Sequence, residues 1–288
     1  MASMVDIKSR IKSVKSTKQI TKAMNLVAAA KLQRAKNRLG STRPFYEQTR
    51  NVISNIVKNS EDITHPFIKK RDVKNTVIIL ITGDRGLCGG YNSNIIKAAF
   101  AATKERKNVS IIAVGKKGID FFSKEDPEIM KDYVGVSEKP VYEDAARIGD
   151  IIVDLYTKEE VDEVLLAYTV FESTITHVPT VETLLPIDIS KLQSEDGEQK
   201  GAKNLMLYEP NENVVLSYVV PKYINTLIYG ALAESAACEQ GARMTSMDSA
   251  TKSANETIDS MTILYNRARQ SAITQEITEI IGGASALV

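Results

Sequence analysis

The chain has few of the residues that build metal centres and disulfide frameworks. Its 288 residues include two cysteines, two histidines and no tryptophan. Cys88 and Cys238 lie far apart in the sequence, as do His65 and His177, and none of the four has the spacing of a metal-ligand set. We therefore expect no metal site and no cysteine–histidine nucleophile pair, and two isolated thiols favour a reducing compartment.

Long apolar runs are also missing. No stretch approaches the ~20 residues that cross a bilayer, and the opening residues MASMVDIKSR contain no apolar signal core. A hydrophobic content of 43%, a charged content of 25% and a net charge of +1 are typical of a globular protein. We therefore expect a cytosolic chain that meets a membrane only through its partners.

Acidic residues are almost absent near the N-terminus. Between Lys8 and Arg50, Glu47 is the one acidic residue against twelve lysines and arginines. The aromatic residues that single-strand-binding surfaces interleave with basic ones come only later, at Phe45 and Tyr46. We expect no nucleic-acid partner; a coiled-coil nucleic-acid adaptor is the alternative, and it requires an affinity that falls steeply with salt.

Helix-breaking residues are rare at both ends of the chain. Residues 3–58 contain one proline and one glycine, and residues 213–281 contain one proline. In both segments apolar residues recur at steps of three and four, as in a coiled-coil seam. Because so long a helix needs a partner along its length, the pattern predicts an antiparallel coiled coil of helices 1–58 and 209–288.

The middle of the chain has a different pattern, in which short apolar runs alternate with amphipathic segments. The strand-like runs are residues 75–82, 108–115, 161–172 and 180–187, and the helix-like segments are residues 92–106 and 143–160. Buried strands that alternate with helices predict a largely parallel sheet, so residues 74–190 are expected to form an inserted α/β domain. The polar residues 191–208 are expected to form a loop.

A glycine-rich turn, GDRGLCGG, follows the first strand-like run at Gly83–Gly90. It lacks both the G-x-G-x-x-G spacing of dinucleotide loops and the Lys-Ser/Thr pair of triphosphate loops. The motif favours a tight turn where a neighbouring backbone passes close. The alternative is a nucleotide-binding α/β enzyme that uses this loop, with Arg85 meeting an anion at a helix start capped by Asn92 or Ser93.

The C-terminal helix is expected to extend about 15 residues beyond its partner, which is about 20 Å. Polar residues cluster near the end of this helix: Arg267, Arg269, Gln270, Thr274, Gln275, Glu276 and Glu279. A lone helix in water is marginally stable, so something outside this chain is expected to surround the tip. No carboxylates elsewhere form an obvious catalytic pair, and we predict no catalytic residues.

Three stretches resemble the gamma subunits of F-type ATP synthases, in that family's order. They are DIKSRIKSVKSTKQITKAMNLVAAAKL at 6–32, DRGLCGGYN at 84–92 and YNRARQSAITQEITEIIGGA at 265–284. The resemblance covers nearly the whole chain. It implies a long antiparallel coiled coil with an inserted Rossmann-like α/β domain, whose glycine-rich turn is not a catalytic nucleotide site.

The resemblance implies a rotor shaft that is not itself an enzyme and carries no cofactor. Its implied partners are an alpha3-beta3 hexamer that makes and hydrolyses ATP, the epsilon subunit, delta through the complex, and the c-ring. Ion flow turns the c-ring, and the asymmetric shaft drives each beta subunit through its states in turn, which also regulates ATPase activity and ion flow. The implied location is peripheral, on the cytoplasmic face of a bacterial cell membrane.

The same resemblance assigns partner contacts to particular residues. The contacts to a beta-subunit catch loop are Arg269 and Gln270, with Arg267, Thr274, Glu276 and Glu279 nearby. Those facing the acidic lever of beta are Met24, Arg243, Lys8, Lys12, Lys15, Lys18 and Lys22, and those on the c-ring and epsilon side are Leu207, Tyr208 and Glu209. Exposed ion pairs contribute only ~0–1 kcal/mol, which suits contacts that form and break at each turn.

Overall fold

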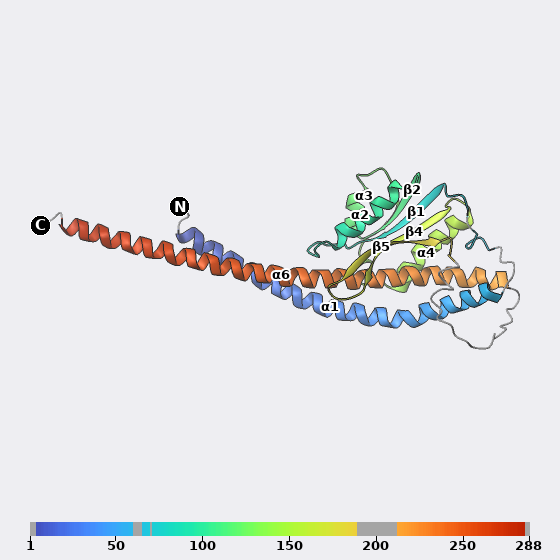
Figure 1. The fold of residues 1–288 in the computed structure, drawn as a ribbon, viewed down its shortest axis with the longest axis horizontal. Coiled ribbons are helices and arrows are strands. Elements are labelled where there is room, and N and C mark those ends of the chain that lie inside the picture. Colours follow the sequence, from blue (N-terminus) through green and yellow to red (C-terminus); the bar gives the residue numbers. More distant parts are fainter. Residues whose placement is uncertain (1–3, 60–64, 70, 189–211, 286–288) are drawn as a thin grey trace. The chain divides into compact units, whose positions relative to one another are not determined.

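The computed structural model describes the chain except for residues 1–3, 60–64, 70, 189–211 and 286–288 (Figure 1). Two long helices, α1 (Met4–Asn59) and α6 (Glu212–Ser285), precede and follow the α/β elements. The chain divides into two compact units, residues 1–28 with 243–288, and residues 29–242, so each long helix contributes to both. Long helices are thus present in both terminal segments, as the sequence predicted.

The shorter elements form a sheet with helices between its strands. They are β1 (Asn75–Ile81), α2 (Tyr91–Lys104), β2 (Asn108–Val114), α3 (Lys116–Phe122), β3 (Glu128–Tyr133), α4 (Tyr142–Thr157), β4 (Glu163–Phe171) and β5 (His177–Leu185). The strand order is β3-β2-β1-β4-β5, and only β5 runs antiparallel to its neighbour. The largely parallel sheet expected from the sequence is therefore confirmed.

Two elements, α3 and β3, were not expected from the sequence. Helix α3 has seven residues, too few to establish a helical period, and β3 reads EIMKDY with its side chains exposed or half-buried. β3 lies at the edge of the sheet and pairs only with β2. Because its side chains are not packed into the core, it lacks the apolar run that identifies the central strands.

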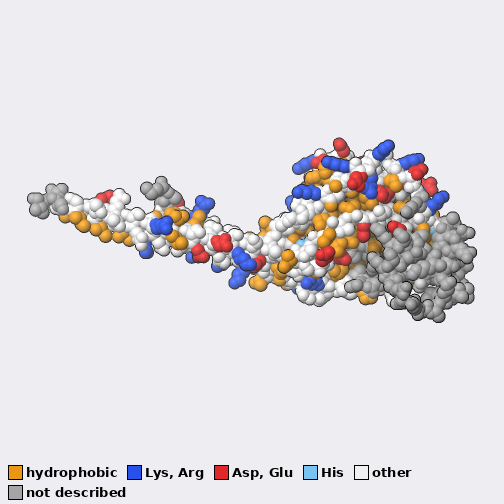
Figure 2. All heavy atoms as spheres, in the orientation of Figure 1, with side chains coloured by type: hydrophobic (Ala, Val, Ile, Leu, Met, Phe, Trp, Pro, Cys, Tyr) orange, Lys and Arg blue, Asp and Glu red, His pale blue; other side chains and the backbone are white. Residues whose placement is uncertain are grey.

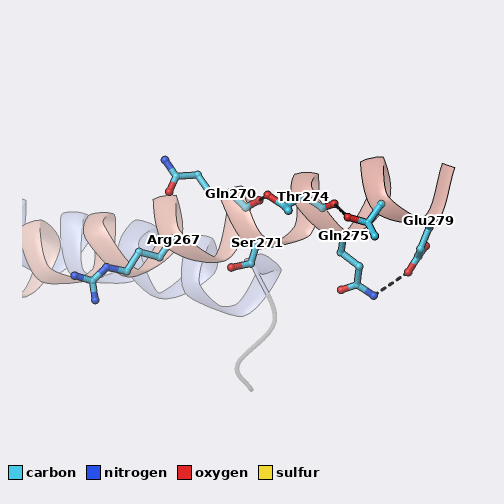
Figure 3. Close-up of a pocket in the computed structure, with 7 residues that line it drawn as sticks. Arg267, Gln270, Ser271, Thr274, Gln275 and Glu279 are labelled. Carbon is cyan, nitrogen blue, oxygen red and sulfur yellow. Dashed lines mark hydrogen bonds between the residues drawn. The ribbon is translucent and has the colours of Figure 1, made fainter. Parts of the chain in front are cut away.

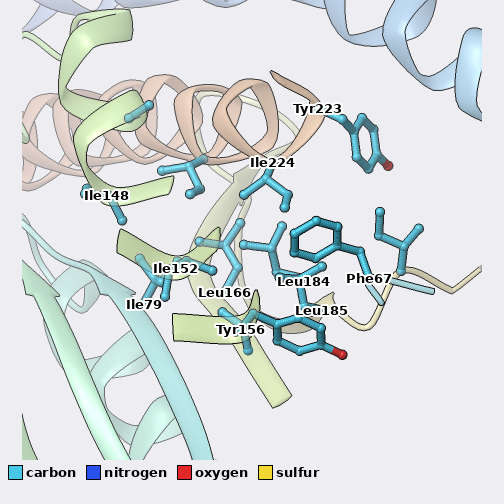
Figure 4. Packing of buried hydrophobic residues seen from close by; sticks show 14 of the residues in the cluster. Phe67, Ile79, Ile148, Ile152, Tyr156, Leu166, Leu184, Leu185, Tyr223 and Ile224 are labelled. Carbon is cyan, nitrogen blue, oxygen red and sulfur yellow. The ribbon is translucent and has the colours of Figure 1, made fainter. Parts of the chain in front are cut away.

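The central strand β1 is buried on both faces. Ile79 and Ile81 belong to a cluster with residues of α4 and α6, whereas Ile78 and Leu80 belong to a second cluster with residues of α2 and α3. Figure 4 shows Ile79 in the first cluster, beside side chains of α4 and α6. Since successive side chains of a strand point to opposite faces, this double burial produces the continuous apolar run of β1.

Helix α4 approaches α6 closely at one glycine. A Cβ on Gly149 would overlap Oδ1 of Asn225, a side chain of α6 that is only 2% exposed. In contrast, a Cβ on Gly230, also within α6, would meet no atom within 4 Å. The contact between α4 and α6 thus depends on a missing side chain at Gly149, whereas Gly230 has open space for one.

Replacing each glycine by alanine tests this packing. Gly149→Ala is expected to destabilise the chain by about 1–3 kcal/mol, because the buried Asn225 has little room to move away. Gly230→Ala is the matched control and is expected to stabilise it by about 0.5–1 kcal/mol, since alanine loses less entropy in a helix. Urea unfolding of the full-length variants, followed by near-ultraviolet circular dichroism, measures both. Equal effects of the two substitutions would contradict the packing argument.

His65 is buried beside α6, with 5% of its surface exposed. Its ring lies 5.2 Å from that of Phe67, and its Nε2 is 3.2 Å from the Ser217 hydroxyl. Burial lowers the pKa of His65 below its ordinary value of 6.5, because the charged imidazolium is poorly solvated there. The unfolded chain therefore binds a proton at His65 more readily than the folded chain does.

This difference predicts how the stability of a His65→Gln variant compares with that of the wild type as pH falls. Below about pH 6.5 the unfolded wild-type chain takes up a proton that the folded chain refuses, so wild-type stability decreases down to the folded-state pKa. The His65→Gln variant has no imidazole at this position, so it does not lose this part of its unfolding free energy. The difference in unfolding free energy between wild type and variant should therefore shift in favour of the variant from pH 7.5 to pH 5. A difference that does not change with pH would show that burial leaves the imidazole unperturbed.

Candidate functional site

The first candidate site is the carboxyl edge of the sheet, where the strand order reverses. From β1 the chain proceeds outward to β2 and β3, and α4 then returns it to β4, on the other side of β1. In open α/β sheets, ligands bind in the crevice at this switch point. The glycine-rich turn Gly83–Gly90 follows β1 at this edge.

Side chains of α6 occupy this crevice. The Ser235 hydroxyl accepts a hydrogen bond from the Thr169 N–H at 3.4 Å, and the Cys238 thiol donates one to the Thr169 carbonyl at 3.4 Å. Glu239 is 0% exposed, and its carboxyl carbon lies 2.9 Å from the point where a Cβ on Gly83 would stand. The chain therefore fills with its own helix the space in which related folds hold a phosphate.

The electrostatics of the crevice also oppose an anion. Tyr91, the first residue of α2, is 5% exposed, and burial followed by the nearby Glu239 charge raises its pKa well above 10. Burial, and after it the charge of Glu234, likewise raises the pKa of the Cys238 thiol. A phosphate at the start of α2 would meet a buried carboxyl group, and a thiol held in its neutral form is a poor nucleophile.

The turn itself is closed by Asn92. Its Oδ1 accepts the Gly83 N–H at 2.8 Å, and its Nδ2 donates to the Arg85 carbonyl and the Cys88 sulfur, both at 3.2 Å. The N-cap of α2 is Gly90, with no side-chain hydrogen bond, so the expected cap by Asn92 or Ser93 is wrong. The neighbour that requires the glycine at position 83 is a side chain of α6 rather than a backbone.

Arg85, the residue predicted to meet an anion, faces a carboxylate of its own chain. Its guanidinium Nε lies 3.8 Å from Glu138, and Glu138 also accepts a hydrogen bond from Lys31 of α1 at 3.2 Å. Arg85 remains 76% exposed, so this pair is weak. The turn therefore has an internal partner for its one arginine.

The second candidate site is the two-helix unit formed by residues 4–28 of α1 and 243–285 of α6. The hydroxyl oxygens of Thr21 and Thr251 lie 2.8 Å apart, and Asn25 Nδ2 donates to the Met244 carbonyl at 2.9 Å. As the residue number rises along α1 it falls along α6, so the helices are antiparallel, as predicted. Among the buried and half-buried α6 side chains of this unit, one series follows steps of three and four: Met247, Thr251, Ala254, Ile258, Met261, Tyr265, Ala268 and Ala272.

Beyond Ala272 the burial of α6 stops. Every residue from Ile273 to Ala284 is exposed, including four isoleucines with 47–70% of their surface free. These isoleucines are Ile273, Ile277, Ile280 and Ile281. Figure 2 shows hydrophobic atoms running along this end of α6, which we call the tip. No described part of the chain covers the tip, as the sequence predicted.

The predicted catch residues lie at and just before the tip, and all six are exposed: Arg267, Arg269, Gln270, Thr274, Glu276 and Glu279. Four of them line one shallow hollow, shown in Figure 3. The hollow is lined by Arg267, Gln270, Thr274 and Glu279, together with Ser271, Gln275 and Thr278. Ser271 and Thr278 had no signal in the sequence beyond their helical spacing from the others.

Local hydrogen bonds hold part of this polar surface in place. The Thr274 hydroxyl donates to the Gln270 carbonyl at 2.9 Å, and Gln275 Nε2 donates to Glu279 at 2.9 Å. The side chains of Arg267, Arg269 and Glu276 extend from an exposed helix. The surface offers both hydrogen-bond donors and acceptors but encloses no substrate-sized chamber.

The predicted lever residues differ in accessibility. Four lysines of α1 are exposed, whereas Lys18 and Met24 are half-buried at the seam of the two helices. The exposed ones are Lys8, Lys12, Lys15 and Lys22. Arg243 is only 8% exposed. The predicted c-ring residues Leu207, Tyr208 and Glu209, like the predicted loop 191–208, lie outside the described residues.

Within the described part of the chain, no three His, Cys, Asp or Glu side chains come together in a group that suits a metal ion. No described helix combines the length and the apolar character needed to span a bilayer.

Comparisons with known proteins agree along the whole chain. The model of a family described as ATP synthase matches residues 3–287. The chain is 49% identical over 284 residues to the ATP synthase gamma chain of Alkaliphilus metalliredigens, covering 99% of this chain and 98% of the relative. It is 42% identical over 295 residues to the sodium ion specific ATP synthase gamma chain of Acetobacterium woodii, covering 98% of each.

Solved structures show the same likeness. A chain from the central stalk and c-ring structure of the Tetrahymena thermophila mitochondrial ATP synthase is 28% identical, with a TM-score of 0.60, and the match covers 80% of this chain and 99% of that one. A chain from the rotor of the Euglena gracilis mitochondrial ATP synthase matches with a TM-score of 0.65 over 94% of this chain and 98% of that one. At 18% identity, the second match speaks for the fold alone.

The filled crevice predicts that the full-length chain does not bind nucleotides through its glycine-rich turn. Equilibrium dialysis with ATP and with NAD should show no saturation below about 1 mM, a binding free energy of about −4 kcal/mol at most. The physical reason is that Glu239 fills the space beside Gly83 and leaves no room there for a phosphate. Micromolar binding that Gly83→Val abolishes would contradict this and restore the enzyme alternative.

Proposed function

The chain belongs to the gamma-chain family of ATP synthases, which form the central stalk of the rotor, and on this basis we propose how it carries rotation. It transmits torque between the c-ring and the beta subunits of an alpha3-beta3 hexamer and performs no catalysis itself. Through this coupling it regulates ATP hydrolysis and ion flow. The observation that carries the proposal is the uncovered tip of α6, from Ile273 to Ala284.

The tip needs a partner for a physical reason. A single helix exposed to water on all sides is marginally stable, and its four isoleucines leave apolar surface in contact with solvent. An enclosing hexamer removes that surface from water. Because the tip tapers into small residues, Gly282, Gly283 and Ala284, an apolar sleeve can hold it with little rotational interlock.

The polar surface before the tip suits a contact that forms and breaks. We assign Arg269 and Gln270 to the hydrogen bonds with a beta-subunit catch loop, with Arg267, Thr274, Glu276 and Glu279 beside them. All six are exposed, so each bond exchanges with water at a modest net free energy. A rotor that must leave one beta subunit for the next requires such reversible contacts.

A second contact involves the basic face of α1. We assign Lys8, Lys12, Lys15 and Lys22, with Lys18 and Met24 at the seam, to the side that meets the acidic lever of beta. Their charge complements that lever, and solvent exposure keeps each pair weak. Arg243 has a different environment, since it is only 8% exposed, and we assign it the role of supporting the shape of this side of the coil.

The foot of the rotor completes the proposal. We assign Leu207, Tyr208 and Glu209 to the side of the c-ring and epsilon. The chain reaches the cytoplasmic face of a bacterial membrane only as a peripheral member of the complex, to which delta also belongs. One relative is named as sodium ion specific, and the coupling ion is a property of the membrane subunits.

Replacing the two central catch residues tests this assignment. In a reconstituted complex, Arg269→Ala with Gln270→Ala is expected to lower the rates of ATP-driven rotation and of ATP synthesis by roughly tenfold, because lost polar contacts of about 1.4 kcal/mol slow a step by that factor. Single-molecule rotation and gradient-driven ATP synthesis measure the effect. The folding of the chain, followed by circular dichroism, should not change.

A matched control is available on α1. Gln33→Ala with Arg34→Ala replaces the same residue types at adjacent, exposed helical positions, and it should rotate and synthesise ATP as the wild type does. Wild-type behaviour of the Arg269 and Gln270 variant would remove the catch assignment and leave the rotor in place. A wild-type chain that does not copurify with alpha and beta subunits would refute the rotor itself.

A further inference from the structure

The contact between Glu239 and Gly83 joins α6 to the glycine-rich turn of the sheet. We propose that Glu239 is a positioning residue that fixes the orientation of α6 against this turn. A turning force on the α/β domain then turns α6 with it, because the helix cannot rotate relative to the sheet. The inference deepens the proposed rotor function and rests on it. In this proposal, the crevice that binds nucleotides in similar folds serves here to transmit force to α6.

In this contact a buried carboxyl group occupies the space that a side chain at position 83 would need. Glu239 is 0% exposed, and its three carboxyl atoms lie 2.9–3.2 Å from the point where a Cβ on Gly83 would stand. The backbone around Gly83 is fixed by Asn92, whose Oδ1 accepts the Gly83 N–H at 2.8 Å and whose Nδ2 donates to the Arg85 carbonyl at 3.2 Å. A side chain enclosed in this way opposes rotation of its helix, whereas apolar burial alone has no preferred direction.

Two neighbouring residues on the same side of α6 reinforce this contact. Ser235 and Cys238 both bond the Thr169 backbone near the end of β4. Gly241 lies on nearly the opposite side of α6 from Glu239, and a Cβ on it would lie 2.9 Å from Nε2 of His177, the first residue of β5. Near Glu239, α6 is therefore in contact with the sheet and its connections on two sides.

The place of this contact along α6 gives it a mechanical meaning. The compact unit that contains the sheet ends at Ala242, and α6 continues without a break from Arg243 as part of the two-helix unit. Glu239 is therefore in the last turn of α6 that the sheet holds. Torque that passes from the α/β domain into the two-helix unit along α6 must cross this turn.

The chemistry of Glu239 separates a positional role from core packing. Burying a carboxyl group costs free energy, and a leucine of similar size would fill the space at a lower desolvation cost. Core stability alone therefore does not explain this side chain. A glutamine has nearly the same shape without the ionisable group, so comparing the two separates shape from charge.

The experiment compares four variants in the complete complex, reconstituted in lipid vesicles: Glu239→Ala, Glu239→Gln, Gly83→Ala and the double variant Gly83→Ala with Glu239→Ala. Gly230→Ala adds a methyl group to the same helix where no atom lies within 4 Å and is the control. The readout is coupling, which is the rate of gradient-driven ATP synthesis divided by the rate of ATP hydrolysis. A merely structural role would change both rates together and leave this ratio unchanged.

We expect Glu239→Ala and Gly83→Ala each to lower the ratio at least about fivefold, the lower end of coupling between distant sites. Glu239→Gln and Gly230→Ala should keep the wild-type ratio. The double variant should recover most of the ratio, because the new Cβ at position 83 fills part of the space that Glu239 leaves.

Three results would overturn the proposal: a wild-type ratio in Glu239→Ala, a loss in Glu239→Gln as large as in Glu239→Ala, or additive losses in the double variant. If Glu239→Ala does not assemble, Glu239→Gln and the double variant decide the question by the same criteria. Failure of the wild-type chain to assemble would instead refute the proposed rotor function, so the two failures are distinguishable.

Discussion

The packing of α6 in two different environments is the constraint on which the structure depends. Up to Ala242 the helix contributes Leu216, Val220, Ile224 and others to the core beneath the sheet, and from Arg243 it pairs with α1. A helix of 74 residues has little stability by itself, so both environments must cover it. The tip is the part of α6 that no described part of the chain covers.

The α/β domain illustrates that a fold does not determine a function. Its sheet reverses strand order as ligand-binding sheets do, yet its glycine-rich turn lacks both phosphate-loop patterns, and the switch-point crevice is filled by Ser235, Cys238 and Glu239 of α6. What binds a dissolved ligand in an enzyme here binds a helix of the same chain. The crevice thereby holds α6 against the sheet.

Charged and polar groups have different environments in the α/β unit and in the two-helix unit. Arg106 and Glu163 form a short, partly buried ion pair in the α/β unit, and this bond raises the pKa of the guanidinium. Near the tip of α6 the polar residues are exposed, and Thr274 and Gln275 bond within their own helix. A partly buried pair restrains the geometry within its unit, whereas exposed groups remain accessible from solvent.

The sequence by itself determined the elements whose signals are local. The steps of three and four in both terminal segments and the apolar run of β1 identified helices and strands directly, because burial imposes those periods on neighbouring residues. The edge strand β3 was not predicted, because its exposed residues show no periodic pattern of apolar side chains. Only the tertiary structure decided that Glu239 fills the space at Gly83, since that contact joins distant residues and depends on how a helix lies across a sheet.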